Sequence, residues 1–291
     1  FGVVESADLP ARLTFLVEMV GKKDLPSAVP INTGIFNTAR FIGPAVAGTI
    51  IGTAGIAWPF LLNGISYLAG IWAIVKIKPL FINEADLNVH PIESLKQGIV
   101  YSFTHPKLIH FILLAFFTAI FIWPFQTLMP IVSETVFHTG AQGYGSLLSA
   151  AGLGSLSGAI YTSANSTKAH KIVFVERGIM LSSIGLILFS LNSNFLLAHL
   201  FLFISGAGTL MMISTLNTLV QLNSPDNMRA RVMSVYLTMF LGMMPLGNAL
   251  AGLIAEHTSA IFTIGLSGGI FLIIGLVFHF KGYFTKLSEQ N

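Results

Sequence analysis

Three charged residues near the start of the chain have the spacing of one helix face. Glu5, Asp8 and Arg12 follow one another at i, i+3 and i+7 in a largely apolar run. A carboxylate desolvated in a cavity is pushed toward its neutral form, and a nearby arginine favours its charged form. We therefore expect Asp8, with Glu5 as second choice, to couple proton movement to a conformational change. The alternative is a structural pair of Asp8 with Arg12 or Arg40 that only fixes helix packing.

A permanent charge also lies inside the apolar segment "NTARFIGPAVAG", residues 37–48. In a helix that begins near residue 28, Arg40 is about 18 Å from the start, too deep for its side chain to reach the interface. An arginine left in lipid costs roughly 2.5 to 3.5 kcal/mol, so we expect Arg40 to face a cavity or a carboxylate. There it would gate the cavity or bind an anionic group. The predicted cavity and gating residues are Arg12, Asn37, Arg40, Gly43, Pro44 and Gly48, and the Gly43-Pro44 pair is expected to kink the cavity wall.

Polar and aromatic residues in other apolar segments are weaker candidates for lining a substrate path. Trp123 and Gln126 cluster toward the outer end of the segment 108–132, although an interfacial aromatic belt explains Trp123 equally well. The others more often make hydrogen bonds between helices than bind ligands. The predicted substrate-path residues are Asn63, Tyr67, Trp123, Gln126, Asn217 and Gln221.

The residue types argue against several other chemistries. The chain has no cysteine, which excludes disulfides, CxxC redox chemistry and thiolate metal sites. No HExxH occurs and the eight histidines are scattered, so we expect no metal site and no cofactor. A net charge of only +3, without a basic cluster interleaved with aromatics, predicts no nucleic-acid partner.

An intramembrane hydrolase is the alternative function to consider. The sequence "GLSGG", residues 265–269, matches the serine-nucleophile pattern GxSxG and would make Ser267 the nucleophile. Such chemistry needs a histidine within hydrogen-bond reach, and only His199 or His110 could serve. Helix packing by small residues explains the same pattern without any catalysis.

The composition places these residues in a membrane. Hydrophobic residues make up 54% of the 291 residues and charged residues 9%, and the mean hydropathy is +0.78, whereas a soluble domain has about a quarter of its residues charged. Apolar stretches of roughly 20 residues, the length that crosses a bilayer, recur throughout. We predict helices over residues 28–52, 58–76, 108–132, 143–164, 172–191, 195–222, 231–255 and 259–280, and the last part of one more span over 1–20.

Connections that carry Lys or Arg alternate along the chain with connections that carry neither. Short cytoplasmic loops collect Lys and Arg, whereas external loops do not. The alternation predicts a cytoplasmic C-terminus. The basic connections carry Lys22 and Lys23; Lys76, Lys78, Lys96 and Lys107; Lys168, Lys171 and Arg177; Arg229 and Arg231; and Lys281 and Lys286.

One long polar connection, residues 77–107, divides the predicted helices into two bundles. Within it, "IESLKQGIVYSF" has the apolar spacing of a helix that lies in the interface plane. We predict the remainder of an N-terminal bundle over 1–78, a cytoplasmic linker with an amphipathic helix over 79–106, and a C-terminal six-helix bundle with a short tail over 107–291. In the latter, the small residues Ser146, Ala150, Gly154 and Gly158 recur every four positions, which predicts close helix packing.

Two segments of the chain are similar to each other. "DLPSAVPINTGIFNTARFIGPAVAG" and "SPDNMRARVMSVYLTMFLGMMPLGNALAG" each contain a loop Asp, a helix start, an internal Gly/Pro kink and a final Ala-Gly. Superposing Gly48 on Gly252 gives an offset of 204 residues, the size of a six-helix half in transporters built from parallel repeats. The repeat predicts that about three and a half helices precede residue 1.

The same segments resemble the major facilitator superfamily, in the branch of bacterial enterobactin exporters and macrolide efflux pumps. "DLPARLTFLVEMVGKKDLPSAVPINTGIFNTARFIGPAVAG" resembles that branch's fourth and fifth helices, and "DNMRARVMSVY" resembles the start of its eleventh. Gly43-Pro44 with Ala47-Gly48 resembles the proton-antiporter motif of helix five, although Ala39 and Ala47 stand where the family usually has Gly.

The resemblance implies an all-α membrane protein with a two-bundle fold, of which this chain holds about eight full transmembrane helices and part of another, the first three being absent. It implies a proton-coupled antiporter that exports a small amphipathic molecule, siderophore or macrolide, by alternating access. The expected partners are that molecule, protons and the lipid bilayer of the cell inner membrane, with the protein acting as a monomer. The other alternative is a truncated membrane protein that transports nothing.

Overall fold

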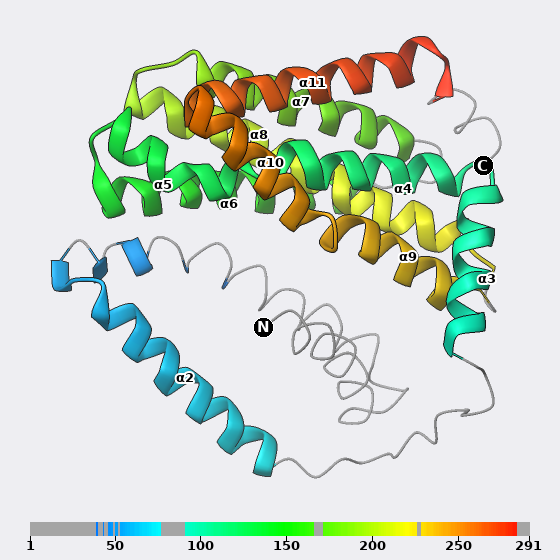
Figure 1. The fold of residues 1–291 in the computed structure, drawn as a ribbon, viewed down its shortest axis with the longest axis horizontal. Helices are drawn as coiled ribbons and strands as arrows, with labels where there is room; N and C mark the ends of the chain where they lie inside the picture. The colour runs from blue at the N-terminus through cyan, green and yellow to red at the C-terminus, as the bar shows by residue number, and fades with distance from the viewer. Residues whose placement is uncertain are drawn as a thin grey trace.

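The computed structural model describes residues 39, 43, 46–48, 50–51, 53–76, 91–165, 171–225 and 228–283. Every regular element in these ranges is helical (Figure 1). In chain order these elements are α2 (Ala57–Lys76), α3 (Pro91–Thr104), α4 (Leu108–Phe117), the π-helix η1 (Thr118–Ile122), α5 (Phe125–Thr135), α6 (Gly140–Asn165), α7 (Lys171–Ser190), α8 (Phe195–Leu222), α9 (Arg229–Leu241), α10 (Met244–His257) and α11 (Ala260–Phe280).

Six stretches in the described ranges are long and apolar enough to cross a membrane. They are Ala57–Lys76, Leu108–Thr135, Lys171–Ser190, Phe195–Leu222, Arg229–His257 and Ala260–Phe280. The helix α6 has 26 residues and is long enough to cross a membrane. It is not among the six stretches, and its sequence is rich in Gly and Ser. Each of these helices begins within a few residues of its predicted start, so the prediction of an all-helical, multi-pass membrane protein is confirmed. The total number of helices stays a prediction.

The span predicted over 108–132 is present as Leu108–Thr135, but its helix is interrupted. The N–H of Trp123 donates to the carbonyl of Thr118, five residues back, at 3.0 Å, which closes the π-helical turn η1. Pro124 follows directly and has no N–H to continue the helix. The polypeptide therefore crosses as three successive pieces, α4, η1 and α5, that end at Thr135.

A second break separates α9 from α10, where the sequence predicts an internal Gly/Pro kink. The helix α9 ends at Leu241 and α10 begins at Met244, with Pro245 in its first turn. Proline is tolerated there because a first-turn N–H has no partner inside the helix. The structure therefore confirms a kink at this position.

The core of the bundle is a seam in which α8 packs closely against α6 on one side and α7 on the other. A Cβ on Gly154 would overlap the carbonyl oxygen of Phe203, and one on Gly158 would overlap that of Ala207. In return, Gly206 of α8 lies against the carbonyl of Ala151. Backbones this close require glycine, so the predicted packing role of Gly154 and Gly158 is confirmed.

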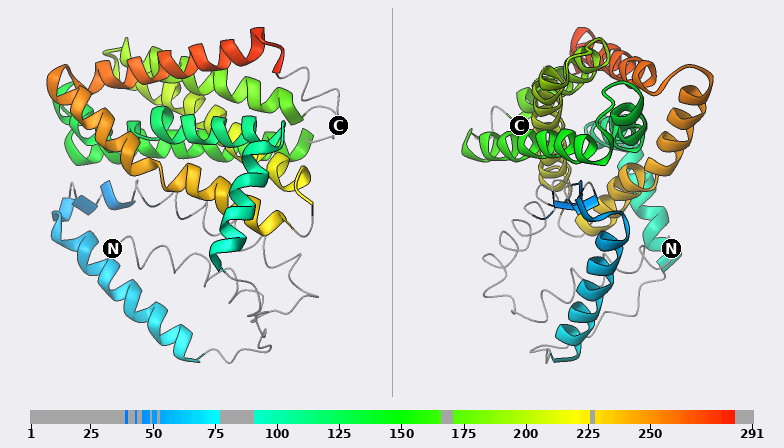
Figure 2. Two further views of the ribbon diagram at one scale, coloured as in Figure 1. Left: turned by 45° about the vertical axis from the view of Figure 1, so that its right-hand side comes forward. Right: turned by 90° about the vertical axis from the view of Figure 1, so that its left-hand side faces the viewer.

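The predicted linker helix is present as α3 and lies across one end of the bundle (Figures 1 and 2). A Cβ on Gly98 would lie 3.1 Å from the carbonyl oxygen of Arg231, so α3 and α9 are in backbone contact. The Nη1 of Arg231 also donates to the Oε1 of Gln97 at 2.6 Å. The apolar side chains of Ile99 and Phe103 are exposed, as expected for a helix at the membrane interface.

The helix α2 stands apart from the bundle in Figures 1 and 2. None of its residues is buried within the described part of the chain, although it is apolar along its whole length. A helix of this composition buries its surface in lipid or against other helices. The residues 77–90 that follow it lie outside the described ranges.

Candidate functional site

A cavity of about 210 Å³ lies where the two interrupted spans meet the α6–α8 seam. Residues from α5, α6, α8 and α9, together with the η1–α5 junction, form its wall. The lining residues are Trp123, Phe125, Gln126, Leu148, Ala151, Gly152, Ser155, Leu156, Ala159, Gly206, Thr209, Leu210, Ile213 and Phe240. Cavities between bundle helices are common places for small-molecule sites, which makes this one the candidate site.

Aromatic rings form one wall of this cavity. Trp123 and Phe240 meet edge to face, with ring centroids 5.5 Å apart and an interplanar angle of 82°. The π-helical turn places Trp123 at this wall, since it shifts the register of the following residues relative to a regular α-helix. Because π-bulges often occur at functional sites, the interruption of this span fits a role in binding.

The polar groups of the cavity are few and uncharged. The hydroxyl of Ser155 donates to the carbonyl of Gly206 at 3.2 Å, and the hydroxyl of Thr209 donates to the backbone carbonyl of Ser205 at 2.8 Å. The side-chain amide of Gln126 has no hydrogen-bond partner among the described residues, so it is the group left to bind a ligand. No Asp, Glu, Lys or Arg lines the cavity within the described ranges.

Two of the predicted substrate-path residues, Trp123 and Gln126, are brought together in this cavity. The other four lie elsewhere. Asn63 and Tyr67 are exposed on α2, while Gln221 donates to the side-chain carbonyl of Asn217 near the end of α8. Neither Asn217 nor Gln221 contributes to the cavity wall.

Most of the predicted proton-coupling and gating residues fall outside the described ranges. These are Glu5, Asp8, Arg12, Asn37, Arg40 and Pro44. Gly43 is described, and a Cβ there would meet nothing within 4 Å.

Gly48 is buried against the start of α6. A Cβ at Gly48 would lie 2.9 Å from both the carbonyl oxygen of Ala141 and the Cα of Gly145. The N-terminal segment therefore contacts the same helix whose next turns, from Leu148 onward, line the cavity.

Apart from Trp123 and Gln126, the residues that line the cavity were not predicted as site residues from the sequence. Ser155, Thr209 and Phe240 lie on three different helices, and nothing in their local sequence marks them as neighbours. The interruption at Pro124 was the one available signal, because a proline inside an apolar span indicates an irregular backbone.

The histidines proposed for a hydrolase have other partners. The Nε2 of His199 lies 3.0 Å from the hydroxyl of Ser146, and the ring of His110 packs against that of Tyr283 with centroids 4.5 Å apart. Ser267 lies on α11 and makes no side-chain hydrogen bond within the described residues. These contacts favour packing as the explanation of "GLSGG".

Comparison with known proteins matches this chain to the family described as transmembrane secretion effector, over residues 1–290. The chain is 24% identical over 297 aligned residues to the staphyloferrin A transporter of Staphylococcus aureus (strain NCTC 8325 / PS 47), covering all of this chain and 73% of that relative. It is 23% identical over 280 aligned residues to the enterobactin exporter EntS of Shigella flexneri, covering 95% of this chain and 65% of that relative. The chain thus spans about two thirds to three quarters of these relatives' lengths.

Proposed function

Because the chain belongs to the transmembrane secretion effectors of the major facilitator superfamily, a family of transporters and not of enzymes, we propose that it exports a small amphipathic molecule by alternating access. The observation that carries this proposal is the cavity between α5, α6, α8 and α9. Its aromatic wall, and the Gln126 amide that has no partner among the described residues, suit a cargo with planar or apolar parts and a few hydrogen-bonding groups.

We further propose that the cargo is of the siderophore type, since both relatives are named for such molecules. The cavity wall supplied by α5 to α9 carries no charge among its described residues. An anionic cargo would therefore find its counter-charge on the N-terminal segment, where Arg12 and Arg40 are the cationic residues of the apolar helices.

The contact of Gly48 with α6 supports this role for Arg40. In the predicted topology the two segments run in opposite directions. Eight residues of helix span about 12 Å, so the predicted helix would bring Arg40 level with the part of α6 near Gly152, which lines the cavity.

We propose that protons drive the export and that Asp8, with Glu5 as second choice, binds them. The proposed setting is the cell inner membrane, with a cytoplasmic C-terminus and a monomeric protein. The sequence supports these proposals through the acidic residues in an apolar run and the alternating basic connections.

The test of the cargo proposal uses the full-length protein reconstituted in proteoliposomes with an imposed pH gradient. Gln126→Leu is expected to lower uptake of a labelled siderophore into these proteoliposomes, by the protein molecules inserted inside out, by about tenfold. The substitution removes a hydrogen bond and leaves a cargo group unpaired. Thr127→Val is the matched control, because Thr127 is exposed on the same helix. Equal uptake by the Gln126→Leu variant and the wild type would refute the role of this cavity.

The test of the coupling proposal is separate. Asp8→Asn is expected to abolish cargo-dependent proton flux while cargo binding to the detergent-solubilised protein persists. Proton flux that continues unchanged in both Asp8→Asn and Glu5→Gln would rule out these carboxylates as the coupling groups.

A further inference from the structure

Tyr236 of α9 carries a buried hydroxyl that has no hydrogen-bond partner among the described residues. The whole residue is only 1% exposed, so the hydroxyl is shielded from solvent as well. The phenol oxygen lies at the far end of the ring, out of reach of the carbonyls of its own helix turn. A buried donor without a bond raises the free energy of the packed arrangement, because it gives up water partners and gains none.

The surroundings of Tyr236 explain why its hydroxyl stays unpaired. The helix α9 packs against α3, α4, η1 and α8. The buried residues of α4 are all apolar, and so are the other buried residues of α9. They are Leu108, Phe111, Ile112, Leu114 and Ala115 of α4 and Val232, Val235 and Phe240 of α9. A phenylalanine at position 236 would suit this packing better than a tyrosine does.

Elements next to α9 carry further buried polar atoms of this kind. On α10, the second half of the same interrupted span, the Oδ1 of Asn248 accepts no hydrogen bond from the described residues. On α3, which packs across α9, the hydroxyl of Ser102 is fully buried and unpaired in the same sense. The packing around α9 therefore leaves several polar groups without partners within the described part of the chain.

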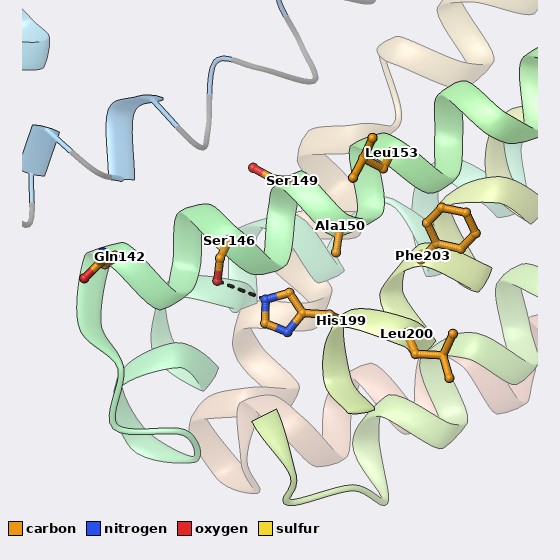
Figure 3. A pocket seen from close by; sticks show the side chains of 8 residues that line it. All are labelled: Gln142, Ser146, Ser149, Ala150, Leu153, His199, Leu200 and Phe203. Atoms are coloured by element: carbon orange, nitrogen blue, oxygen red, sulfur yellow. Dashed lines mark hydrogen bonds between the residues drawn. The ribbon is translucent and has the colours of Figure 1, made fainter. Parts of the chain in front are cut away.

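The side chains of a groove between two continuous helices show the opposite. This groove of about 690 Å³ lies on the other side of the α6–α8 seam, and the residues that line it are labelled in Figure 3. It shares no lining residue with the cavity. The Nε2 of His199 lies 3.0 Å from the hydroxyl of Ser146, and the hydroxyl of Ser149 donates to the carbonyl of Gly145 at 2.7 Å. These polar groups are thus paired within the packed helices.

Unpaired hydroxyls at Ser183 of α7 and Ser205 of α8 lie where the helices are locked together. Gly178 and Gly208 bring α7 and α8 into backbone contact, and a Cβ on either glycine would lie 2.7 Å from the carbonyl oxygen of the other. The helix α9, in contrast, is joined to α10 through a break at residues 242–243. Helix pieces rotate at such breaks, so the hydroxyl of Tyr236 lies on an element that is able to move.

We propose that the unpaired hydroxyl of Tyr236 favours the opening of α9, and that this opening admits cargo to the cavity from the end of the bundle at which α9 begins. When α9 rotates away from the bundle, water reaches the hydroxyl and its cost is removed. Phe240 lies about one helix turn further along α9 and lines the cavity, so the same movement opens the cavity wall.

The direction of this opening suits an exporter. The end of the bundle at which α9 begins carries Arg229 and Arg231, and it is cytoplasmic in the proposed topology. An exporter takes up its cargo from that side. The link to cargo rests on the proposed function, whereas the effect of Tyr236 on α9 does not.

The experiment measures the opening of α9 by alkylation of a buried cysteine in the full-length protein. The 291 residues contain no cysteine, so Val235→Cys introduces a single reporter beside Tyr236, and any cysteine elsewhere is replaced by serine. Val235 is 3% exposed, so a water-soluble maleimide reacts in nanodiscs at a rate that follows the open fraction. The control reporter is Val175→Cys, because Val175 is fully buried and also lies in the second turn of its helix, α7.

Tyr236→Phe removes only the hydroxyl, and we expect it to slow alkylation of Val235→Cys by about tenfold. Alkylation of Val175→Cys should not change. The melting temperature in detergent should rise, and uptake of a labelled siderophore into the proteoliposomes should fall about threefold. Tyr236→Leu leaves a void in the packing and is expected to speed alkylation of Val235→Cys.

Ser183→Ala is the matched control, because it removes an unpaired and fully buried hydroxyl from the locked seam. We expect a higher melting temperature, as in Tyr236→Phe, but unchanged alkylation of Val235→Cys and unchanged uptake. This control separates an effect on the opening of α9 from an effect on overall stability.

The proposal is overturned if Tyr236→Phe leaves alkylation of Val235→Cys unchanged or makes it faster. An equal slowing by Ser183→Ala, or an equal slowing at Val175→Cys, would overturn it too, because the effect would then be one of overall stability. Slower alkylation with unchanged uptake would reject the role of α9 in cargo entry. If the wild type takes up no siderophore, the proposed function fails, while the alkylation rates still decide the role of Tyr236.

Discussion

The cavity and the groove share the α6–α8 seam but differ in the helices that complete them. Among the described residues, those that line the groove all lie on α6 and α8. These two helices are continuous over 26 and 28 residues. The cavity is completed by two interrupted spans, one broken at η1 and Pro124 and the other at Gly242 and Met243. Continuous helices hold a fixed shape, whereas breaks allow the flanking pieces to move.

The difference teaches where this bundle can change shape. A transported molecule needs a site that opens and closes, and the interrupted spans supply that on the cavity side only. The groove has none of the irregular backbone that would permit such movement. The polar groups differ as well, since the amide of Gln126 in the cavity has no hydrogen-bond partner among the described residues, whereas His199 and Ser146 of the groove hydrogen-bond each other.

The largest expected effect comes from disrupting the seam that the two hollows share. Gly154→Leu would drive a side chain into the backbone of Phe203, so we expect at least about 3 kcal/mol of lost stability and loss of transport. Thermal unfolding in detergent measures the stability. Gly269→Leu is the control, because a Cβ at Gly269 would meet nothing within 4 Å. A folded Gly154→Leu variant with normal transport would contradict this role of the seam.

A pair of conservative aromatic changes separates the two hollows. Phe240→Leu removes the edge-to-face contact with Trp123, and we expect about a threefold to tenfold weaker binding of the cargo. Phe203→Leu, in the groove, is expected to leave cargo binding unchanged. Binding is measured by intrinsic fluorescence titration. If both changes weakened the binding equally, the hollows would not be independent.

Straightening one of the breaks tests whether movement is confined to the cavity side. Pro124→Ala restores an N–H that can bond within a regular helix, so we expect a higher melting temperature and about a threefold lower transport rate. Alkylation of the Val175→Cys reporter, on the continuous helix α7, should not change. The matched control is Pro130→Ala, since Pro130 lies inside α5, away from the break, and is exposed. Faster transport by Pro124→Ala would contradict the proposed role of the break.

Hydropathy and the alternation of basic loops were sufficient to place the described helices. The predicted segment 195–222 coincides with α8 at both ends. The start of α8 is fixed by Asn194, whose side-chain oxygen accepts hydrogen bonds from the N–H groups of Leu196 and Leu197. The π-helical turn η1 was not predictable in the same way. It depends on a bond between Thr118 and Trp123 and on packing against α10 and α11, which lie more than 100 residues away in the sequence.

Within the candidate site, only residues that lie close together in the sequence were predicted. Trp123 and Gln126 are close in sequence and their pairing could be anticipated, whereas Phe240 reaches the same cavity from a helix that only the tertiary fold brings near. His199 and Ser146 were each noted for another reason, and 53 residues separate them. Local patterns specify which faces are apolar, but they do not specify which polar side chains meet across helices.

The smallest expected effect concerns α3, which touches neither hollow. Gln97→Ala removes the acceptor that lies 2.6 Å from the guanidinium of Arg231. Because Gln97 is exposed, and because Gly98 keeps its close backbone contact with Arg231, we expect a loss of only about 1 kcal/mol or less. Hydrogen exchange of the α3 amides should quicken while cargo binding stays unchanged, and Lys96→Ala, on the exposed side of the same helix, should change neither of the two. A larger loss of transport in Gln97→Ala than in Phe240→Leu would mean that the linker helix, and not the broken spans around the cavity, limits the movement of the bundle.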